Sequence, residues 1–134
     1  MKPLFLRIGA VAASAALMCF LFACSQAPTQ EEMVSKAQEI NASDLRKQIL
    51  SNSAKAEQDW EGQLVKYTGV FDGVSNDEAE MHQETYNGLP LNAIYVELSQ
   101  DELASLERGK TYTVVGKTDI FDSGFSIREA FLVE

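Results

Sequence analysis

The second half of the chain contains five short stretches in which apolar and polar residues alternate. A period of two is typical of strands with one buried face, because successive side chains of a strand point to opposite sides of the sheet. We predict strands over residues 64–74, 80–86, 91–98, 111–120 and 125–133. The turn residues Asn87-Gly88 and Asp122-Ser123-Gly124 separate neighbouring stretches. Five short strands of this kind predict a small closed or partly closed barrel.

Helical spacing comes before the strands. Met33, Ala37 and Ile40 lie at i, i+4 and i+7, and a second apolar stripe runs from Leu45 to Trp60 with a weak point at residues 52–53. A further helical turn is expected over residues 101–107. We therefore predict a mainly β domain with an N-terminal helix (α+β), in which one or two α-helices precede a five-stranded Greek-key barrel. We expect Tyr67, Val96 and Val114 to be buried together, with Trp60 covering one end.

An uncharged and almost wholly apolar run follows two basic residues at the start of the chain. It extends from Ile8 to Cys24, behind Lys2 and Arg7. This layout is typical of a secretory signal peptide, and the run is short for a membrane span of about 20 residues. We predict a signal peptide over residues 1–23; an uncut single-pass anchor is the alternative.

The end of the apolar run has a more specific pattern. Leu21-Phe22-Ala23-Cys24-Ser25 resembles the lipobox of bacterial lipoproteins, with Leu at −3, Ala at −1 and Cys at +1. The resemblance implies a diacylglyceryl group on the Cys24 sulfur, cleavage before Cys24, and acylation of the new amino group by a chain such as palmitate. Two or three acyl chains would anchor the protein stably to a membrane. Ser25 at +2 favours the periplasmic side of the outer membrane if the organism is Gram-negative.

These observations divide the chain into three parts. We predict the lipoprotein signal peptide at residues 1–23, a lipidated N-terminus and tether at residues 24–34, and one folded domain at residues 35–134. The length beyond the signal peptide fits one small domain.

The chain beyond the signal peptide is strongly acidic. The sequence has 11 basic and 20 acidic residues, and residues 1–23 hold two of the basic ones and none of the acidic ones, which leaves a net charge of about −11. Arg108, Lys110 and Lys117 could form one small basic patch, but acidic residues stand close to them in the sequence. Because cations supply most of the non-specific affinity for a phosphate backbone, we expect no nucleic acid among the partners.

Several short motifs follow the expected helix and strands. They are Asp44-Leu45, Asn52, Ala56 and the stretches 60–63, 65–71, 106–109, 112–117 and 125–130. On these motifs, residues 45–132 resemble the bacterial OB-fold lipoprotein family labelled tRNA-anticodon-like. The resemblance implies an OB-fold barrel and carries over no catalytic residue.

Two tyrosines fall on the part of the expected barrel that OB folds use to bind ligands. Tyr95 lies on the outer face of the third predicted strand, and Tyr86 ends the second. This region is the usual binding face for oligonucleotides and oligosaccharides, whose bases and rings stack on aromatic side chains. We predict a ligand face at Tyr86 and Tyr95; isolated surface tyrosines are the alternative.

The sequence offers little for catalysis or metal binding. His82 is the only histidine, and Cys24 is the only cysteine after Cys19, so neither a Ser-His-Asp set nor a histidine-rich metal site can be assembled without His82. We expect His82 to be a solvated side chain, and we expect no cofactor and no metal ligand set. The acidic segment 72–84 leaves a cation site open as the alternative to a solvated face.

Taken together, the residues favour a non-enzymatic, membrane-anchored envelope lipoprotein. Its OB-fold module would bind another envelope protein, a peptide or a small ligand, and the alternative is a carbohydrate- or peptidoglycan-binding OB domain. The expected partners are the lipid bilayer, through acyl chains on Cys24, and another envelope protein or a glycan. An enzyme is the weakest hypothesis because no nucleophile–base pair is evident.

Overall fold

A computed structural model describes residues 26–134 of the chain. The predicted signal peptide and the predicted lipidation site at Cys24 lie outside the described residues. Within residues 26–134, no helix has the length and apolar character needed to cross a membrane.

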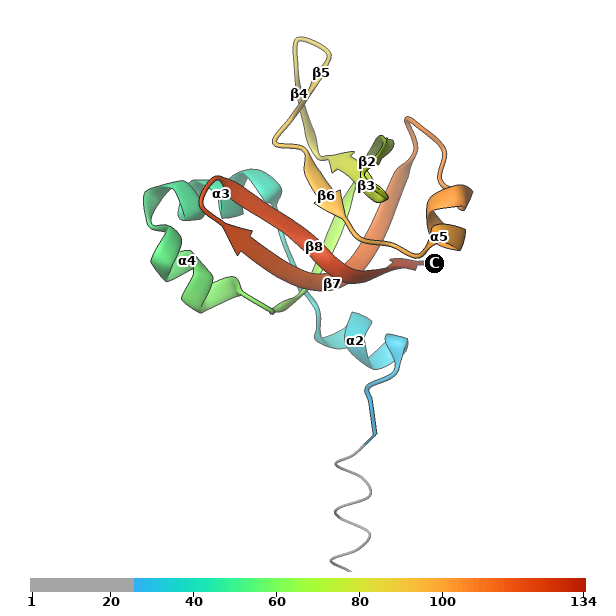
Figure 1. Ribbon diagram of the computed structural model, residues 1–134, viewed down its shortest axis with the longest axis horizontal. Coiled ribbons are helices and arrows are strands. Elements are labelled where there is room, and N and C mark those ends of the chain that lie inside the picture. The colour runs from blue at the N-terminus through green and yellow to red at the C-terminus, as the bar shows by residue number, and fades with distance from the viewer. Residues whose placement is uncertain (1–25) are drawn as a thin grey trace, which may run out of the picture.

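Five strands close into a barrel (Figure 1). In barrel order they are β2 (Leu64–Ser75), β3 (Glu78–His82), β6 (Ile94–Val96), β8 (Gly124–Val133) and β7 (Thr111–Phe121). Pairing of β2 with β7 closes the ring, and all neighbours are antiparallel except β6 and β8. The predicted α+β class and the five-stranded OB-fold-like barrel are confirmed.

Strand β2 is long and pairs with two neighbouring strands, and it bends between the two pairings. Its first half pairs with β7 and its second half with β3, with a register shift between Phe71 and Gly73. Gly69 lies at the crossing point, where an added Cβ would approach the His82 carbonyl oxygen and the Tyr67 ring to 2.7 Å. Only glycine fits at this distance, so this residue allows the curvature that closes the barrel. The short β1 (Gln38–Glu39) adds a parallel pairing to the start of β2.

Four described helices surround the barrel: α2 (Gln30–Lys36), α3 (Ala42–Ser51), α4 (Ser53–Trp60) and α5 (Gln100–Ser105). Asn41 caps α3 by accepting from the Asp44 N–H at 3.0 Å. Asn52 ends α3 and caps α4, accepting from the Lys55 N–H at 3.1 Å. The long apolar stripe is therefore two helices, broken at the residue where the sequence predicts a weak point. Helix α2 overlaps the range 24–34 that we predicted as tether.

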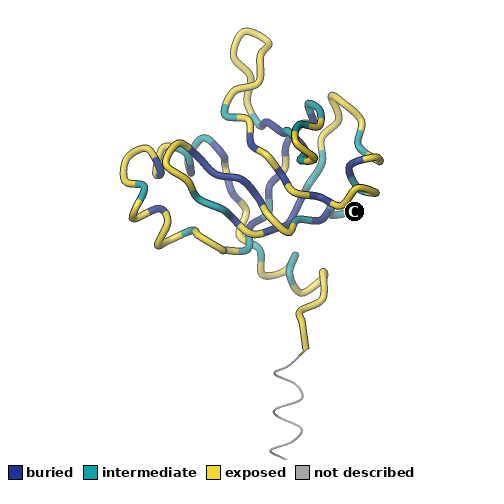
Figure 2. The backbone as a smooth tube through the Cα atoms, viewed as in Figure 1, coloured by how far each residue is buried: buried dark blue, intermediate teal, exposed yellow. Residues whose placement is uncertain are grey.

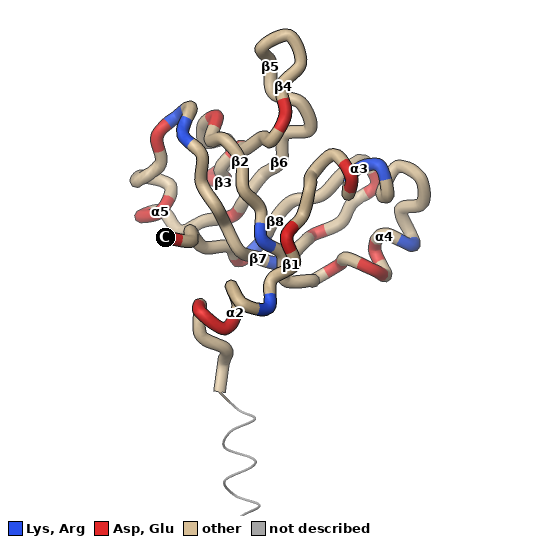
Figure 3. The backbone as a smooth tube through the Cα atoms, turned by 180° about the vertical axis from the view of Figure 1, so that it is seen from behind, with Lys and Arg blue, Asp and Glu red and all other residues tan. Residues whose placement is uncertain are grey.

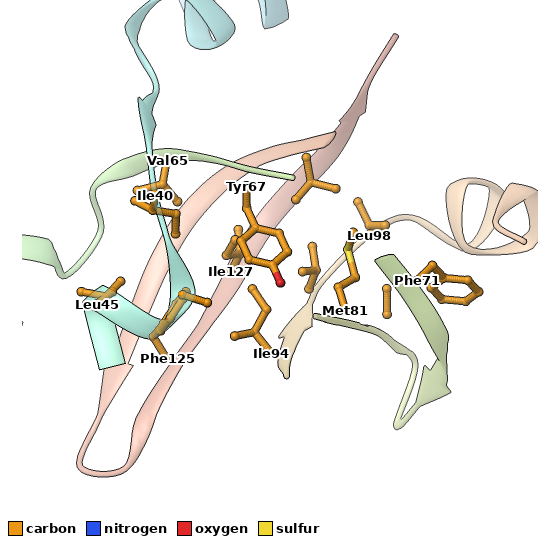
Figure 4. Close-up of a cluster of buried hydrophobic side chains, with 14 of the residues drawn as sticks. Ile40, Leu45, Val65, Tyr67, Phe71, Met81, Ile94, Leu98, Phe125 and Ile127 are labelled. Carbon is orange, nitrogen blue, oxygen red and sulfur yellow. The ribbon is translucent and has the colours of Figure 1, made fainter. Parts of the chain in front are cut away.

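The core lies inside the barrel and under α3 (Figure 4). Tyr67, Val96 and Val114 have no exposed surface, as predicted. Trp60 packs against one end of this core and donates from its indole nitrogen to Gln48 Oε1 at 3.0 Å, which joins α4 to α3. Helix α3 contributes Ala42, Leu45 and Ile49 to the core, and it therefore sits directly on the barrel.

The second predicted strand, residues 80–86, is two strands. Strand β3 ends at His82, and β4 (Glu84–Tyr86) pairs with β5 (Leu89–Leu91) in a separate hairpin that projects from the barrel and is exposed (Figure 2). The side chain of Gln83 explains the break. Its amide accepts from the Ala42 N–H at 2.8 Å and donates to the carbonyls of Ile40 and Thr68. These bonds fix the chain at residue 83, and the residues that follow leave the sheet.

Candidate functional site

A hollow of about 190 Å³ lies between α3, the start of β6 and the turn that joins β7 to β8. We call it the α3 hollow. Its ten lining residues include one arginine and three aromatic residues but no carboxylate; they are Ala42, Arg46, Asn92, Ala93, Ile94, Tyr95, Phe121, Ser123, Gly124 and Phe125. The chain has 20 acidic residues, so a lining with a positive charge and no negative one differs from the chain as a whole.

Arg46 supplies the positive charge of the hollow. It follows the buried Leu45 on α3, and its Nη1 donates to Asn92 Oδ1 at 3.0 Å. Asn92 has a φ of 55°, a left-handed conformation that asparagine tolerates better than most residues. One hydrogen bond therefore fixes the guanidinium group and leaves other N–H donors for a ligand.

Two exposed aromatic rings line the same hollow. Tyr95 lies between the buried residues Ile94 and Val96 on β6, so its ring points to the outer face of the barrel. Phe121 ends β7 at the turn to β8. Tyr95 is 42% and Phe121 46% exposed, which leaves surface on both rings for stacking.

The position of the hollow matches the ligand face of OB folds. Counted along the barrel sequence, β6 is the third strand and the turn at residues 122–123 joins the fourth strand to the fifth. OB folds bind oligonucleotides and oligosaccharides over strands 2–3 and the loops between strands 1–2 and 4–5.

The sheet surface beside the hollow is occupied by ion pairs. Arg128 Nη1 donates to Glu78 Oε1 at 3.0 Å, and its Nε donates to Asp119 Oδ2 at 3.3 Å. Glu80 lies directly opposite Tyr95 in the register of β3 and β6. Arg128 is therefore held by carboxylates, whereas the arginine of the α3 hollow is held by a neutral amide.

The two predicted ligand residues have different positions. Tyr95 lines the α3 hollow. Tyr86 lies on the projecting hairpin, where it is 68% exposed and opposite Leu89, and it does not line the hollow. A ligand role for either tyrosine stays a prediction.

The expectation of a solvated His82 was wrong. His82 is 7% exposed, and its Nδ1 lies 2.6 Å from Asp72 Oδ2. The register shift in β2 places Asp72 beside the end of β3, so the histidine and the carboxylate join two strands. In residues 26–134, no three or more of the His, Cys, Asp and Glu side chains are grouped closely enough to hold a metal ion.

Arg46 is the site residue that sequence reasoning missed. It belongs to the helices that precede the barrel, and residue spacing does not show that α3 packs over the mouth of the barrel. A partial signal was present, because Arg46 adjoins the apolar stripe through Leu45 and arginine often covers apolar surface with its stem.

No family model matches this chain, and no curated protein matches its sequence. A solved structure of similar fold is a lipoprotein from Klebsiella pneumoniae subsp. pneumoniae MGH 78578, named as a candidate nucleic-acid-binding protein. It is 17% identical, covers 81% of this chain and 100% of its own, and has a TM-score of 0.60. Replication protein A of U. maydis bound to single-stranded DNA is 19% identical over 74% of each chain, with a TM-score of 0.44. The likeness at these identities concerns the fold, and the tRNA-anticodon-like family stays a prediction.

The expectation that the partners exclude nucleic acid was wrong. A solved structure of similar fold is that of a lipoprotein named as a candidate nucleic-acid-binding protein. The physical reason is that a net charge of about −11 is an average over the chain, whereas a ligand responds to the local potential. Among the residues that line the α3 hollow, the charged one is Arg46.

Proposed function

We propose that this protein is a lipid-anchored, non-enzymatic OB-fold binding module of the bacterial envelope, and that it binds a short single-stranded nucleic acid at the α3 hollow. The observation that carries the proposal is the placement of Arg46 with Tyr95 and Phe121 in one carboxylate-free hollow. A planar base can stack on an exposed aromatic ring, and a guanidinium group can bind a phosphate through two parallel hydrogen bonds. The name of the similar Klebsiella pneumoniae lipoprotein supports the same ligand class.

The volume of the α3 hollow limits the size of the ligand group that it can bind. At about 190 Å³ it is smaller than the roughly 300–1,000 Å³ of pockets that enclose a drug-sized molecule. It therefore suits one base or one phosphate group, with neighbouring nucleotides on the surface. Stacking contributes about 1–3 kcal/mol per base, so two exposed rings and one arginine favour weak to moderate affinity.

Support for anchoring comes from the sequence that precedes the domain. Helix α2 begins at Gln30, six residues after Cys24. A lipid on Cys24 would hold α2 close to the bilayer. The β4–β5 hairpin lies on the side of the barrel opposite α2 (Figure 1). If the sulfur of Cys24 carries a diacylglyceryl group, Cys24→Ala should release the protein from membranes, and an unmodified thiol in the intact mass of the wild type would contradict the anchor.

Fluorescence anisotropy of the detergent-solubilised full chain with a labelled single-stranded oligonucleotide, at about 0.15 M salt, tests the ligand. We expect saturable binding that Arg46→Gln weakens by about tenfold or more, because a hydrogen bond to a charged group contributes about 1.5–3 kcal/mol. Tyr95→Ala should weaken it to a similar extent. Lys47→Gln is the matched control, since it removes a positive charge from the next residue of α3 without touching the hollow. Absence of saturable binding, or equal losses for Arg46→Gln and Lys47→Gln, would refute the site.

A protein partner is the second candidate, and the exposed hairpin favours it. Tyr86 and Leu89 are 68% and 70% exposed on two strands that pair with each other, and exposed apolar side chains that are clustered mark interaction surfaces. A photo-crosslinking residue at position 89 in intact cells should then give one discrete adduct. The same residue at position 50, where Leu50 is 62% exposed on α3, is the control; equal labelling at both positions would count against the hairpin.

A further inference from the structure

A second and larger hollow lies away from the α3 hollow, between α2, α5 and the last residues of β8. Its volume is about 980 Å³, and we call it the α2–α5 groove. The apolar lining comes from three elements and consists of Val34, Tyr112, Phe131, Leu132 and Val133. None of the residues that line the α3 hollow takes part in it.

The charges of the groove are all of one sign. Its lining includes Glu31, Asp101, Glu102 and Glu134, and it includes no lysine or arginine. Acidic residues on both α2 and α5 are visible in Figure 3. Glu102 is committed to the fold, because its Oε2 accepts from the Leu132 N–H at 2.6 Å and its Oε1 completes the cap of α5. Glu31 and Asp101 are exposed, each in the first turn of its helix.

The apolar floor of the groove is already ordered. The Tyr112 hydroxyl accepts from the Glu107 N–H at 2.8 Å, and its ring forms a T-shaped pair with the ring of Phe71 at a centroid distance of 6.5 Å. Phe131 is 8% exposed and lies opposite Val115 in the register of β7 and β8. By contrast, α2 has no buried residue, so the face of this helix that carries Val34 is only partly covered. A preformed apolar floor needs little ordering when a partner binds.

We infer that the α2–α5 groove docks a basic, amphipathic helical segment of another envelope protein. Charge complementarity selects this occupant, because a floor of apolar side chains inside a rim of carboxylates matches a helix with one apolar face flanked by lysine or arginine. Amphipathic helices bind hydrophobic grooves through anchors at i, i+3, i+4 and i+7. The contact uses residues outside the α3 hollow, so the inference does not depend on the proposed ligand there.

A designed peptide of leucine and lysine with helical period is the probe, because the natural partner is unidentified. The full chain is reconstituted in nanodiscs of phosphatidylcholine, and peptide binding is followed by fluorescence anisotropy with empty nanodiscs as background. We expect saturable binding above background. A peptide of the same composition, with its leucines spread around the helix, should bind at least about tenfold more weakly because it cannot place its anchors together.

Substitutions then locate the binding site. Glu31→Gln with Asp101→Gln should weaken binding by about fivefold, as expected for two partly exposed ion pairs. Val34→Ser should weaken peptide binding as well. Because α2 has no buried residue, this substitution leaves the core unchanged. Glu57→Gln with Glu84→Gln removes two exposed carboxylates outside the groove and should have no effect.

The inference is overturned if the wild type binds no more peptide than empty nanodiscs do, or if the two pairs of substitutions have equal effects. Arg46→Gln separates this surface from the proposed function, because it should reduce oligonucleotide binding and leave peptide binding unchanged. Loss of both activities in that variant would also overturn the inference, since it would place the peptide at the α3 hollow.

Discussion

The two ends of the β7–β8 hairpin differ in chemistry although the same two strands form both. At the turn, where Phe121 pairs with Gly124, the residues that line the α3 hollow include Arg46 and no carboxylate. At the open end, where Thr113 pairs with Val133, the α2–α5 groove holds four carboxylates and no cation. The difference comes from the helices, because α3 packs at the turn and α2 and α5 lie at the open end.

This contrast shows how a small acidic domain can offer two unlike surfaces. The strands supply apolar and aromatic side chains at both ends of the hairpin, and the flanking helices decide the sign of the charge beside them. A net charge describes solubility and long-range steering, but it does not describe a particular binding surface.

The largest expected effect is loss of the fold, which would abolish both binding surfaces together. Val114 lies on β7 between them and has no exposed surface. Val114→Asp should abolish folding, because an unpaired carboxylate would be buried in an apolar interior, and Val114→Ala should cost about 1–3 kcal/mol through lost burial and a cavity. Thermal and urea unfolding followed by circular dichroism measure both. A melt unchanged by either substitution would mean that β7 has a different register.

The next largest effect should change binding at one end of the hairpin and leave binding at the other end unchanged. Arg46→Glu should lower oligonucleotide affinity by more than tenfold, since it replaces a charged donor with a repelling carboxylate, and it should reduce the slope of log affinity against log salt by about 0.7. Basic-peptide binding at the groove should stay the same. Anisotropy titrations of both ligands at several salt concentrations test this, and parallel losses would show that the two surfaces are coupled.

Much of this architecture could be predicted from the sequence. Alternation of apolar residues located the five barrel strands, and Asn52 marked the break between α3 and α4 because asparagine is a strong helix cap. The β4–β5 hairpin was not predicted, because the bonds of Gln83 that break the strand reach residues up to 43 positions away. The same limit applies to Arg46 and to His82. Tertiary contacts determine the surroundings of both residues, and the periodicity of the local sequence does not predict those contacts.

A smaller effect on binding should come from the N-caps of the helices that lie beside the two ends of the hairpin. Asn41→Ala removes the side-chain cap of α3, and Ser99→Ala removes the capping box of α5. Each should cost about 1 kcal/mol of stability. We expect Asn41→Ala to weaken oligonucleotide binding and Ser99→Ala to weaken peptide binding, each by about twofold, because a helix whose first turn frays positions its side chains less well. The crossed combinations, which should show no change, are the controls.

The smallest effect at neutral pH concerns the core that both ends share. The Tyr67 hydroxyl is buried with no hydrogen-bond partner in the described residues (Figure 4), so Tyr67→Phe should raise stability by up to about 1 kcal/mol. Burial, with a smaller contribution from the charge of Asp72, raises the pKa of Tyr67 well above its usual value of 10.0. The unfolded chain therefore loses this proton first, and stability should fall as the pH rises above about 10. Urea unfolding between pH 8 and 11 should show a shallower fall for Tyr67→Phe; an identical slope would contradict the assignment.

The self-paired β4–β5 hairpin has a consequence for how this domain can change over generations. Its two ends meet at barrel strands that pair with each other, since Met81 lies opposite Ile94, while β4 and β5 pair with one another. A segment of another length whose ends meet at the same spacing could replace the hairpin and leave the barrel register intact. Insertions and deletions should therefore collect between residues 84 and 91 in descendants of this chain. New recognition surfaces can arise there while the barrel is inherited unchanged.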